Sequence, residues 1–196
     1  ILAAGVSQAV QGFTALPAVE GELSEVAAFG AKAVLLDSAF SAQAFEKNLR
    51  ETPVSVVHVA SHARFSADSR QSFLLTYDGR LSIDRLEQQL RTTRLRDDPI
   101  ELLFLSACES AAGDERAALG LAGVAVKAGA RSAVATLWQV SDAATRVLVG
   151  EFYRQLAQPG VSKAEALRRA QQLLLSDLRY RHPGLWSPFM VIGNWL

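Results

Sequence analysis

The sequence has a single cysteine, Cys108, among 196 residues, so no disulfide can form within the chain. A lone thiol persists best in a reducing compartment, and we therefore expect a cytoplasmic protein. Charge of either sign is not in excess, because basic and acidic residues each number 20 and the formal net charge is zero. Without a net field to attract phosphates or anionic lipid, nucleic acid is not expected as a direct partner.

Long uninterrupted apolar runs are also missing. Residues 1–19 carry no charge, but glycine, glutamine and proline interrupt them and no basic segment precedes them, so neither a membrane span nor a signal peptide is expected. The chain begins with Ile1 rather than Met, and we expect that upstream sequence, including an N-terminal portion of the domain, is missing. A hydrophobic content of 49% over this length predicts one domain, residues 1–196.

What the chain does contain is an alternation of short apolar runs with segments of helical period. This pattern predicts an α/β fold in which a mostly parallel sheet is covered by helices. The expected strands are residues 1–6, 32–36, 55–60, 73–76, 100–106, 132–137 and 189–192.

The expected helices are residues 41–50, 83–91, 115–127, 142–156 and 162 to about 180. The last of these should begin with a capping box formed by Ser162 and Glu165. Ser141 or Asp142 should cap the helix before it. The polar stretch 92–99 between a helix and a strand is predicted to be an exposed loop.

Reactive or charged groups follow three of the expected strands within a few residues. His62 comes after 55–60, Cys108 after 100–106, and Asp142 after 132–137. In open α/β sheets the ligand lies beyond the carboxyl ends of the strands, so these residues are expected on one rim.

A thiolate that attacks a carbonyl needs a base for its proton and donors for the oxyanion that forms. Cys108 and His62 supply the nucleophile and base. The backbone N–H groups of Ala63 and Cys108 are natural oxyanion donors, because a chain that turns sharply off a strand leaves amides facing the cleft.

Each of these residues also has a structural interpretation, which is the commoner one when the residue is taken alone. Cys108 fits a small core residue, His62 a ligand of local backbone groups, and Asp142 a helix N-cap. His58, within a strand, and His182, beside a proline, are expected to be structural. The joint placement of Cys108 and His62 favours chemistry.

Motifs for other chemistries are absent. The sequence has no G-x-S-x-G elbow, no glycine-rich phosphate loop, no C-x-x-C and no H-E-x-x-H. Metal ligands are too few for a site, so we expect neither a metal nor a cofactor.

Several segments resemble a known family in order and spacing. VVHVASHARF at 56–65 is similar to the histidine motif of CHAT-domain peptidases, relatives of caspases and separases that are often joined to tetratricopeptide repeats. LSACES at 105–110 resembles the family's nucleophile motif, and AGARSAVATLW at 128–138 its third block. With further likeness at 16–25, 164–171 and 182–193, the resemblance covers nearly the whole chain.

The resemblance implies a caspase-like three-layer α/β sandwich and a cysteine endopeptidase that acts on proteins or peptides without a cofactor. His62 and Cys108 carry over as the catalytic dyad, and Ala63 and Cys108 as oxyanion amides. Asp142 carries over as a residue of the P1 pocket, where an acid would meet arginine or lysine. Family members tend to be held inactive until a repeat domain or an activator protein senses a signal.

One departure keeps other interpretations open. The residue after the catalytic histidine is usually glycine in the family and is Ala63 here, which keeps the amide but restricts its φ. The first alternative is a catalytically silent pseudopeptidase that serves as a protein-interaction module. The second is a non-catalytic α/β domain that binds a nucleotide or partner helix, with Cys108 in its core.

Overall fold

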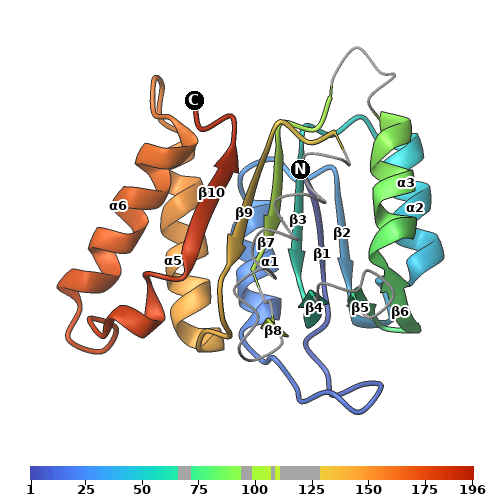
Figure 1. Cartoon of the computed structure of the whole chain (residues 1–196), viewed down its shortest axis with the longest axis horizontal. Helices are drawn as coiled ribbons and strands as arrows, with labels where there is room; N and C mark the ends of the chain where they lie inside the picture. The colour runs from blue at the N-terminus through green and yellow to red at the C-terminus, as the bar shows by residue number, and fades with distance from the viewer. Residues whose placement is uncertain (66–71, 94–98, 107–108, 111–128) are drawn as a thin grey trace.

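The computed structural model describes residues 1–65, 72–93, 99–106, 109–110 and 129–196. A six-stranded sheet in the order β10-β9-β7-β3-β1-β2 forms its centre (Figure 1). Its members are β1 (Leu2–Gly5), β2 (Ala33–Leu36), β3 (Val56–Ala60), β7 (Leu102–Leu105), β9 (Ser132–Thr136) and β10 (Phe189–Gly193). All pairings are parallel except that of β10 with β9, which confirms the predicted mostly parallel α/β fold.

Helices cover both faces of this sheet, so the molecule has three layers (Figure 1). On one face lie α1 (Val19–Ala27), α5 (Asp142–Leu156) and α6 (Lys163–Ser176). On the other lie α2 (Ala42–Glu51) and α3 (Ile83–Thr93). The strand side chains alternate between the two layers: Phe104 of β7 packs with α5, whereas Leu103 and Leu105 pack with the α2 and α3 side.

A second, four-stranded sheet in the order β6-β5-β4-β8 lies at the carboxyl ends of the central strands (Figure 1). It consists of β4 (Ala63–Phe65), β5 (Phe73–Thr76), β6 (Gly79–Ser82) and β8 (Glu109–Ser110). Only β5 of these was predicted from the sequence. The chain passes from β3 directly into β4, and this passage places the residue after Ser61 between the two sheets.

The predicted elements agree with the structure within one or two residues in most cases, and α5 has the predicted bounds. Six helices and strands differ from the prediction. Helix α1 and the strands β4, β6 and β8 were not predicted, and α6 ends at Ser176 rather than near 180. Helix α3 extends to Thr93, into the predicted loop. The predicted helix 115–127 lies outside the described residues.

The capping box predicted for α6 is only half formed. The Ser162 hydroxyl accepts a hydrogen bond from the Glu165 N–H at 3.2 Å, as expected. The Glu165 carboxylate does not complete the box, because it accepts hydrogen bonds from Arg168 and Arg169 at 2.6–2.7 Å instead. Two guanidinium groups one turn onward attract this carboxylate more strongly than a neutral backbone N–H does.

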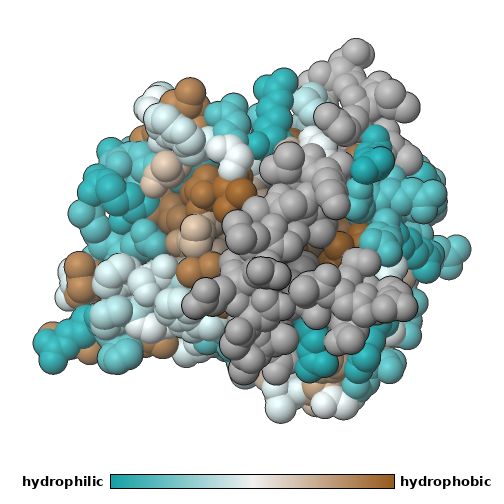
Figure 2. Space-filling model, viewed as in Figure 1, coloured by the Kyte–Doolittle hydropathy of each residue, from teal (hydrophilic) through white to brown (hydrophobic). Residues whose placement is uncertain are grey.

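Edge strand β10 carries apolar surface. Met190 is exposed and Ile192 half-buried, and Figure 2 shows hydrophobic surface in the region of this strand.

Within the described ranges, no helix is both long and apolar enough to span a membrane.

Candidate functional site

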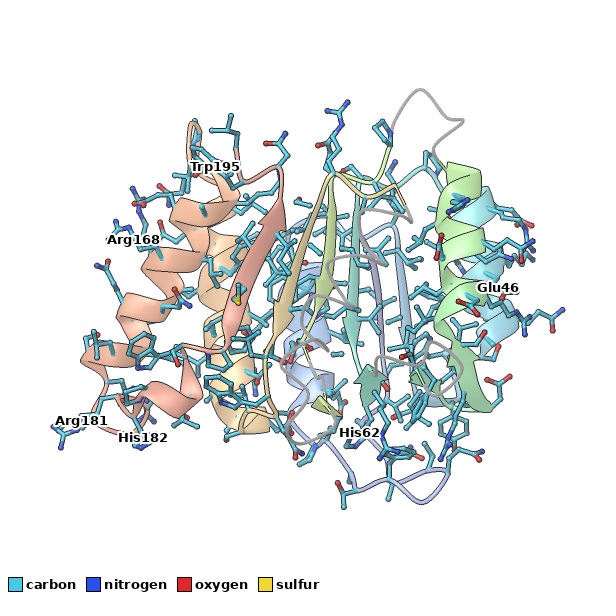
Figure 3. All side chains as sticks on the ribbon, in the orientation of Figure 1. Glu46, His62, Arg168, Arg181, His182 and Trp195 are labelled. Carbon is cyan, nitrogen blue, oxygen red and sulfur yellow. The ribbon has the colours of Figure 1, made fainter. Side chains whose placement is uncertain are left out.

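His62 lies in the turn that joins the two sheets, and β5 fixes this turn on both sides. The Ser61 hydroxyl donates to the Leu75 carbonyl at 2.8 Å, and the Leu75 N–H donates to the His62 carbonyl at 2.8 Å. His62 is only 8% exposed. Figure 3 shows it at the carboxyl ends of the central strands, on the predicted rim.

The His62 ring is held by a backbone carbonyl. Its Nε2 lies 2.8 Å from the Thr14 oxygen. A carbonyl oxygen can only accept, so Nε2 must carry a proton, and Nδ1 is then the acceptor nitrogen of the neutral ring. The Phe13 ring packs against the imidazole with centroids 5.1 Å apart. His62 is thus oriented as a proton acceptor at Nδ1.

Sequence reasoning identified no orienting partner for His62, and Thr14 fills that role. The interaction uses a backbone oxygen, so no side-chain type marks it in the sequence. The only local signal is that Thr14 belongs to the connection after β1, whose carboxyl end lies on the same rim as that of β3.

Ala63 is buried in β4, opposite Leu74 of β5. The hydrogen bond between Leu75 and His62 makes those two residues a hydrogen-bonded pair. Because such pairs alternate along an antiparallel ladder, the Ala63–Leu74 pair is a non-hydrogen-bonded one. The Ala63 N–H therefore points away from β5, toward the edge of β4 that pairs with β8.

Cys108 lies outside the described residues, but the chain on either side of it is described. Before it, the Ser106 N–H donates to the Val59 carbonyl at 3.0 Å and extends the pairing of β7 with β3. After it, Glu109 pairs with Arg64 of β4. The described residues that flank Cys108 thus run beside the same strand end and the same small sheet that hold His62.

Asp142 is the first residue of α5, and its carboxylate binds a different helix from the one we predicted. Oδ2 accepts a hydrogen bond from the Ala18 N–H at 2.6 Å, at the start of α1. Ser141 occupies the N-cap position of α5 without a side-chain capping bond. The prediction that Asp142 or Ser141 caps α5 with its side chain was wrong; Asp142 instead joins the first turn of α1 to that of α5.

The pKa of Asp142 is affected by neighbouring groups, which include His62 on the rim. Burial, reinforced by the charge of Glu22, raises the pKa of the Asp142 carboxyl above its ordinary value. The hydrogen bond from Ala18 and the influence of His62 act in the opposite direction and lower that pKa in part. Asp142 is thus half-buried and within electrostatic reach of His62.

The other two histidines have structural roles, as expected. His58 is fully buried, with Nε2 at 2.8 Å from Glu22 Oε1 and Nδ1 at 3.2 Å from the Tyr153 hydroxyl. Burial and then the Glu22 charge raise the pKa of Tyr153 well above its ordinary value. His182 accepts from the Gly184 N–H at 3.1 Å, far from His62 in Figure 3.

A surface groove between α1 and α5 begins beside Asp142, since Ala18 and Ala143 line it. Its walls include Phe29, Val147 and Tyr180, and the ion pair of Glu25 with Arg146 bridges it at 2.7 Å. Of the described site residues, His62, Ala63 and Asp142 do not line it. We place the candidate site at the His62 rim, where the oriented His62 ring and the Ala63 N–H lie at the junction of the two sheets.

The fold is shared with proteins of known structure. The Porphyromonas gingivalis RgpB complex of pro- and mature domains aligns with a TM-score of 0.63 at 10% identity, over 99% of this chain and 47% of the RgpB chain. The Arg-specific cysteine proteinase gingipain R aligns with a TM-score of 0.62 at 10% identity, over 99% of this chain and 46% of its own. This likeness confirms the caspase-like α/β sandwich.

A family model identifies the family within this fold class. The model of the CHAT domain matches residues 2–194, and the chain belongs to the CHAT domain family.

Curated relatives match over shorter stretches. Tetratricopeptide repeat protein 28 of Homo sapiens is 29% identical over 98 residues, which are 49% of this chain and 4% of that protein. The Mus musculus protein of the same name is 30% identical over 97 residues, or 48% of this chain and 4% of its own length. The matched stretch thus spans only a small part of these relatives.

Proposed function

We propose that this chain is a cysteine endopeptidase that hydrolyses peptide bonds of protein substrates, with Cys108 as nucleophile and His62 as base. The observation that carries the proposal is the hydrogen bond from His62 Nε2 to the Thr14 carbonyl. That bond leaves Nδ1 as the basic nitrogen of an imidazole at the rim, beside the strand that leads to Cys108.

In the proposed acylation, His62 Nδ1 takes the proton of the Cys108 thiol, and the sulfur attacks the carbonyl carbon of the scissile bond. The carbon becomes tetrahedral and negative charge develops on its oxygen. His62 returns the proton to the departing nitrogen, the C–N bond breaks, and a thioester to Cys108 remains. No cofactor takes part in these steps.

Deacylation reverses the roles with water in place of the amine. His62 takes a proton from water, and the hydroxide attacks the thioester carbon. The C–S bond then breaks, the carboxylic acid product leaves, and the Cys108 thiol is restored with the proton from His62.

For the oxyanion we propose the backbone N–H groups of Ala63 and Cys108. The N–H of Ala63 is available for this role because it is directed away from β5. Preorganised donors of this kind contribute a large part of the stabilisation of a tetrahedral intermediate.

For substrate selection we propose that Asp142 lines the P1 pocket and pairs with arginine or lysine. Its Oδ2 already accepts the Ala18 N–H, so the carboxylate is fixed in place on the rim. The gingipain R likeness is in keeping with this proposal, since that protein is named as Arg-specific.

We further propose that a repeat domain or an activator protein regulates the peptidase, in the reducing environment of the cytoplasm. Support comes from the matched relatives, which are named as tetratricopeptide repeat proteins.

One observation favours a second candidate function. Ala63 replaces the glycine expected after the histidine, and the β-carbon limits how the Ala63 amide can adjust to an oxyanion. A catalytically silent pseudopeptidase that serves as an interaction module would tolerate this limit.

Covalent labelling separates the two functions. A peptidyl acyloxymethyl ketone alkylates an activated thiolate with loss of its carboxylate, and intact-mass analysis reads the adduct. We expect stoichiometric labelling of the native chain that is lost in His62→Ala but not in His182→Ala. A native chain labelled no faster than the urea-unfolded one would contradict the peptidase and support the pseudopeptidase.

A further inference from the structure

The loop of residues 7–16, between β1 and α1, supplies the carbonyl that holds His62. Its base is closed by the Leu16 N–H, which donates to the Ser7 carbonyl at 2.9 Å. Its tip turns through left-handed conformations at Gln11, with φ 54°, and Gly12, with φ 83°. The 7–16 loop is therefore a closed unit, and it extends beyond the carboxyl ends of the strands (Figure 1).

One carboxylate fixes the base of the 7–16 loop. Asp37, directly after β2, accepts the Ser7 N–H at 2.7 Å, the Ser7 hydroxyl at 2.7 Å and the Gln8 N–H at 3.2 Å. The Asp37 backbone has φ 50°, a left-handed conformation that aspartate and asparagine adopt more readily than most residues. Three charge-assisted hydrogen bonds thus hold two consecutive residues of the loop.

Tight packing aligns this base with the histidine turn. The Val6 N–H donates to the Ala60 carbonyl at 3.0 Å, just before the loop begins. A β-carbon added at Gly5 would lie 2.6 Å from that same carbonyl, so only glycine allows the approach. The start of the loop and the start of the His62 turn are therefore in direct contact.

Aromatic contacts fix the other end of the loop. The Phe13 ring packs against His62, and against Phe73 of β5 with centroids 5.9 Å apart. The Arg80 guanidinium lies 4.5 Å from the Phe73 centroid and 5.8 Å from that of Phe13. The neighbouring Thr14 carbonyl is thereby held between the anchored base of the loop and the packed ring of Phe13.

We propose that Asp37 is a positioning residue for the dyad: by anchoring the 7–16 loop it keeps the Thr14 carbonyl on His62 Nε2 and so holds the neutral ring in the tautomer with its proton on Nε2. This inference rests on the proposed peptidase function. Asp37 does not touch substrate; it acts through the loop, and loosening the loop lets the imidazole populate its other tautomer.

Two variants loosen the base to different degrees. Asp37→Asn keeps the shape and the left-handed tolerance but removes the charge, and Ser7→Ala removes only the hydroxyl donor. The matched control is Asp177→Asn, which makes the same change at an aspartate that accepts a backbone N–H from Arg179 at 2.9 Å after α6. The ¹⁵N shifts of the His62 ring report the tautomer whether or not the chain turns over peptide, with His62→Gln used for assignment.

We expect the wild-type ring to be the Nε2–H tautomer, and Asp37→Asn to bring its two ¹⁵N shifts together, with Ser7→Ala intermediate and Asp177→Asn unchanged. Per labelled active site, kcat should fall roughly tenfold in Asp37→Asn while KM stays constant. Wild-type ¹⁵N shifts in both Asp37→Asn and Ser7→Ala would overturn the proposal. A wild-type tautomer preference in a native chain that neither turns over peptide nor reacts with the acyloxymethyl ketone would contradict the peptidase function and leave the anchoring by Asp37 measurable.

Discussion

His58 and His62 lie four residues apart on one stretch of chain, and their surroundings differ in kind. His58 is enclosed between the carboxylate of Glu22 and the hydroxyl of Tyr153, so both ring nitrogens are engaged inside the protein. His62 is held at Nε2 by a carbonyl of the 7–16 loop, at the boundary between two sheets. Neither histidine is freely exposed, so burial does not distinguish them.

The difference teaches that the partner atoms decide the role. A ring between a carboxylate and a phenol joins β3 to α1 and α5 and has no nitrogen left for a substrate. A ring whose Nε2–H is bound by a neutral carbonyl has a defined tautomer with a basic nitrogen remaining. The first arrangement ties β3 to two helices, and the second leaves one ring nitrogen for the role of base that we propose.

The largest expected effect comes from removing the rim histidine. His62→Ala should lower kcat/KM by roughly 10²–10⁴-fold, because the thiol loses its general base. The free energy of unfolding should change much less than the rate. His182→Ala, which removes a histidine away from the rim, serves as the control, and steady-state kinetics with circular dichroism measures both. An active His62→Ala variant would contradict the assignment of the base.

The opposite result is expected for the buried histidine. His58→Leu should cost about 3–5 kcal/mol of unfolding free energy, because it leaves the Glu22 carboxyl buried without its partner. Activity per labelled site should persist in the folded fraction.

A double-mutant cycle sharpens this prediction. The pair Glu22→Leu with His58→Leu should be less destabilised than the sum of the single variants, as measured by urea unfolding. Additive single costs would show that Glu22 and His58 are not energetically coupled.

Asp142 can be tested by two substitutions that separate its structural role from its proposed substrate role. Asp142→Asn keeps an acceptor for the Ala18 N–H, whereas Asp142→Ala removes it and should cost about 1 kcal/mol more of unfolding free energy. Both should reduce cleavage after arginine or lysine by roughly tenfold or more relative to cleavage after leucine. If the preference is unchanged in both, Asp142 does not line the P1 pocket.

The preference for cleavage after arginine or lysine should depend on pH in a defined direction. The pKa of Asp142 is raised, so the carboxylate is protonated at a higher pH than an ordinary aspartate. The ratio of basic to neutral P1 cleavage should therefore fall as pH falls through that raised pKa, and taking the ratio cancels any pH effect that is common to both substrates. The folded state disfavours the ionised form of Asp142. The free energy of unfolding contributed by this residue should therefore increase as the pH falls through its raised pKa.

The smallest expected effect is at Glu165, which lies near the start of α6 and is partly exposed. Hydrogen bonds from Arg168 and then Arg169 lower its pKa from 4.5 to about 2. Its stabilising contribution is therefore present above pH 4.5 and is lost as pH falls toward 2, and salt should weaken it. Glu165→Gln should shift the Tm slightly at neutral pH and not at all near pH 2, by calorimetry; an equal shift at both pH values would exclude the ion pairs as the cause.

Much of the fold could be predicted from the sequence, because buried parallel strands form continuous apolar runs and α5 has a clear start. Helix α1 was missed although Val19, Leu23 and Val26 follow helical spacing. Gly21 weakened that signal, because glycine disfavours the interior of a helix. Strands β4 and β8 are too short to show a period and pair with each other across a long stretch of sequence. Strand β6 forms a hairpin with β5, but Leu81 is its one large apolar residue, so it lacks the apolar run of the predicted strands.

The part of the candidate site that lies just after a strand could be predicted from the sequence. His62 follows a buried strand, and its place on the rim is confirmed. The partners of the site residues were not predictable, since Thr14 acts through a backbone oxygen and Asp142 binds the N–H of a residue 124 positions away. Only the three-dimensional arrangement brings those atoms together.

The most direct test of the central claim is turnover of fluorogenic peptides with Arg, Lys, Asp, Leu or Met at P1, by the native chain and by Cys108→Ala. The account predicts hydrolysis by the native chain, preferentially after Arg or Lys, and its complete loss in Cys108→Ala. Hydrolysis that persists in Cys108→Ala, or a native chain that neither cleaves any peptide nor reacts with an active-site probe, would contradict it.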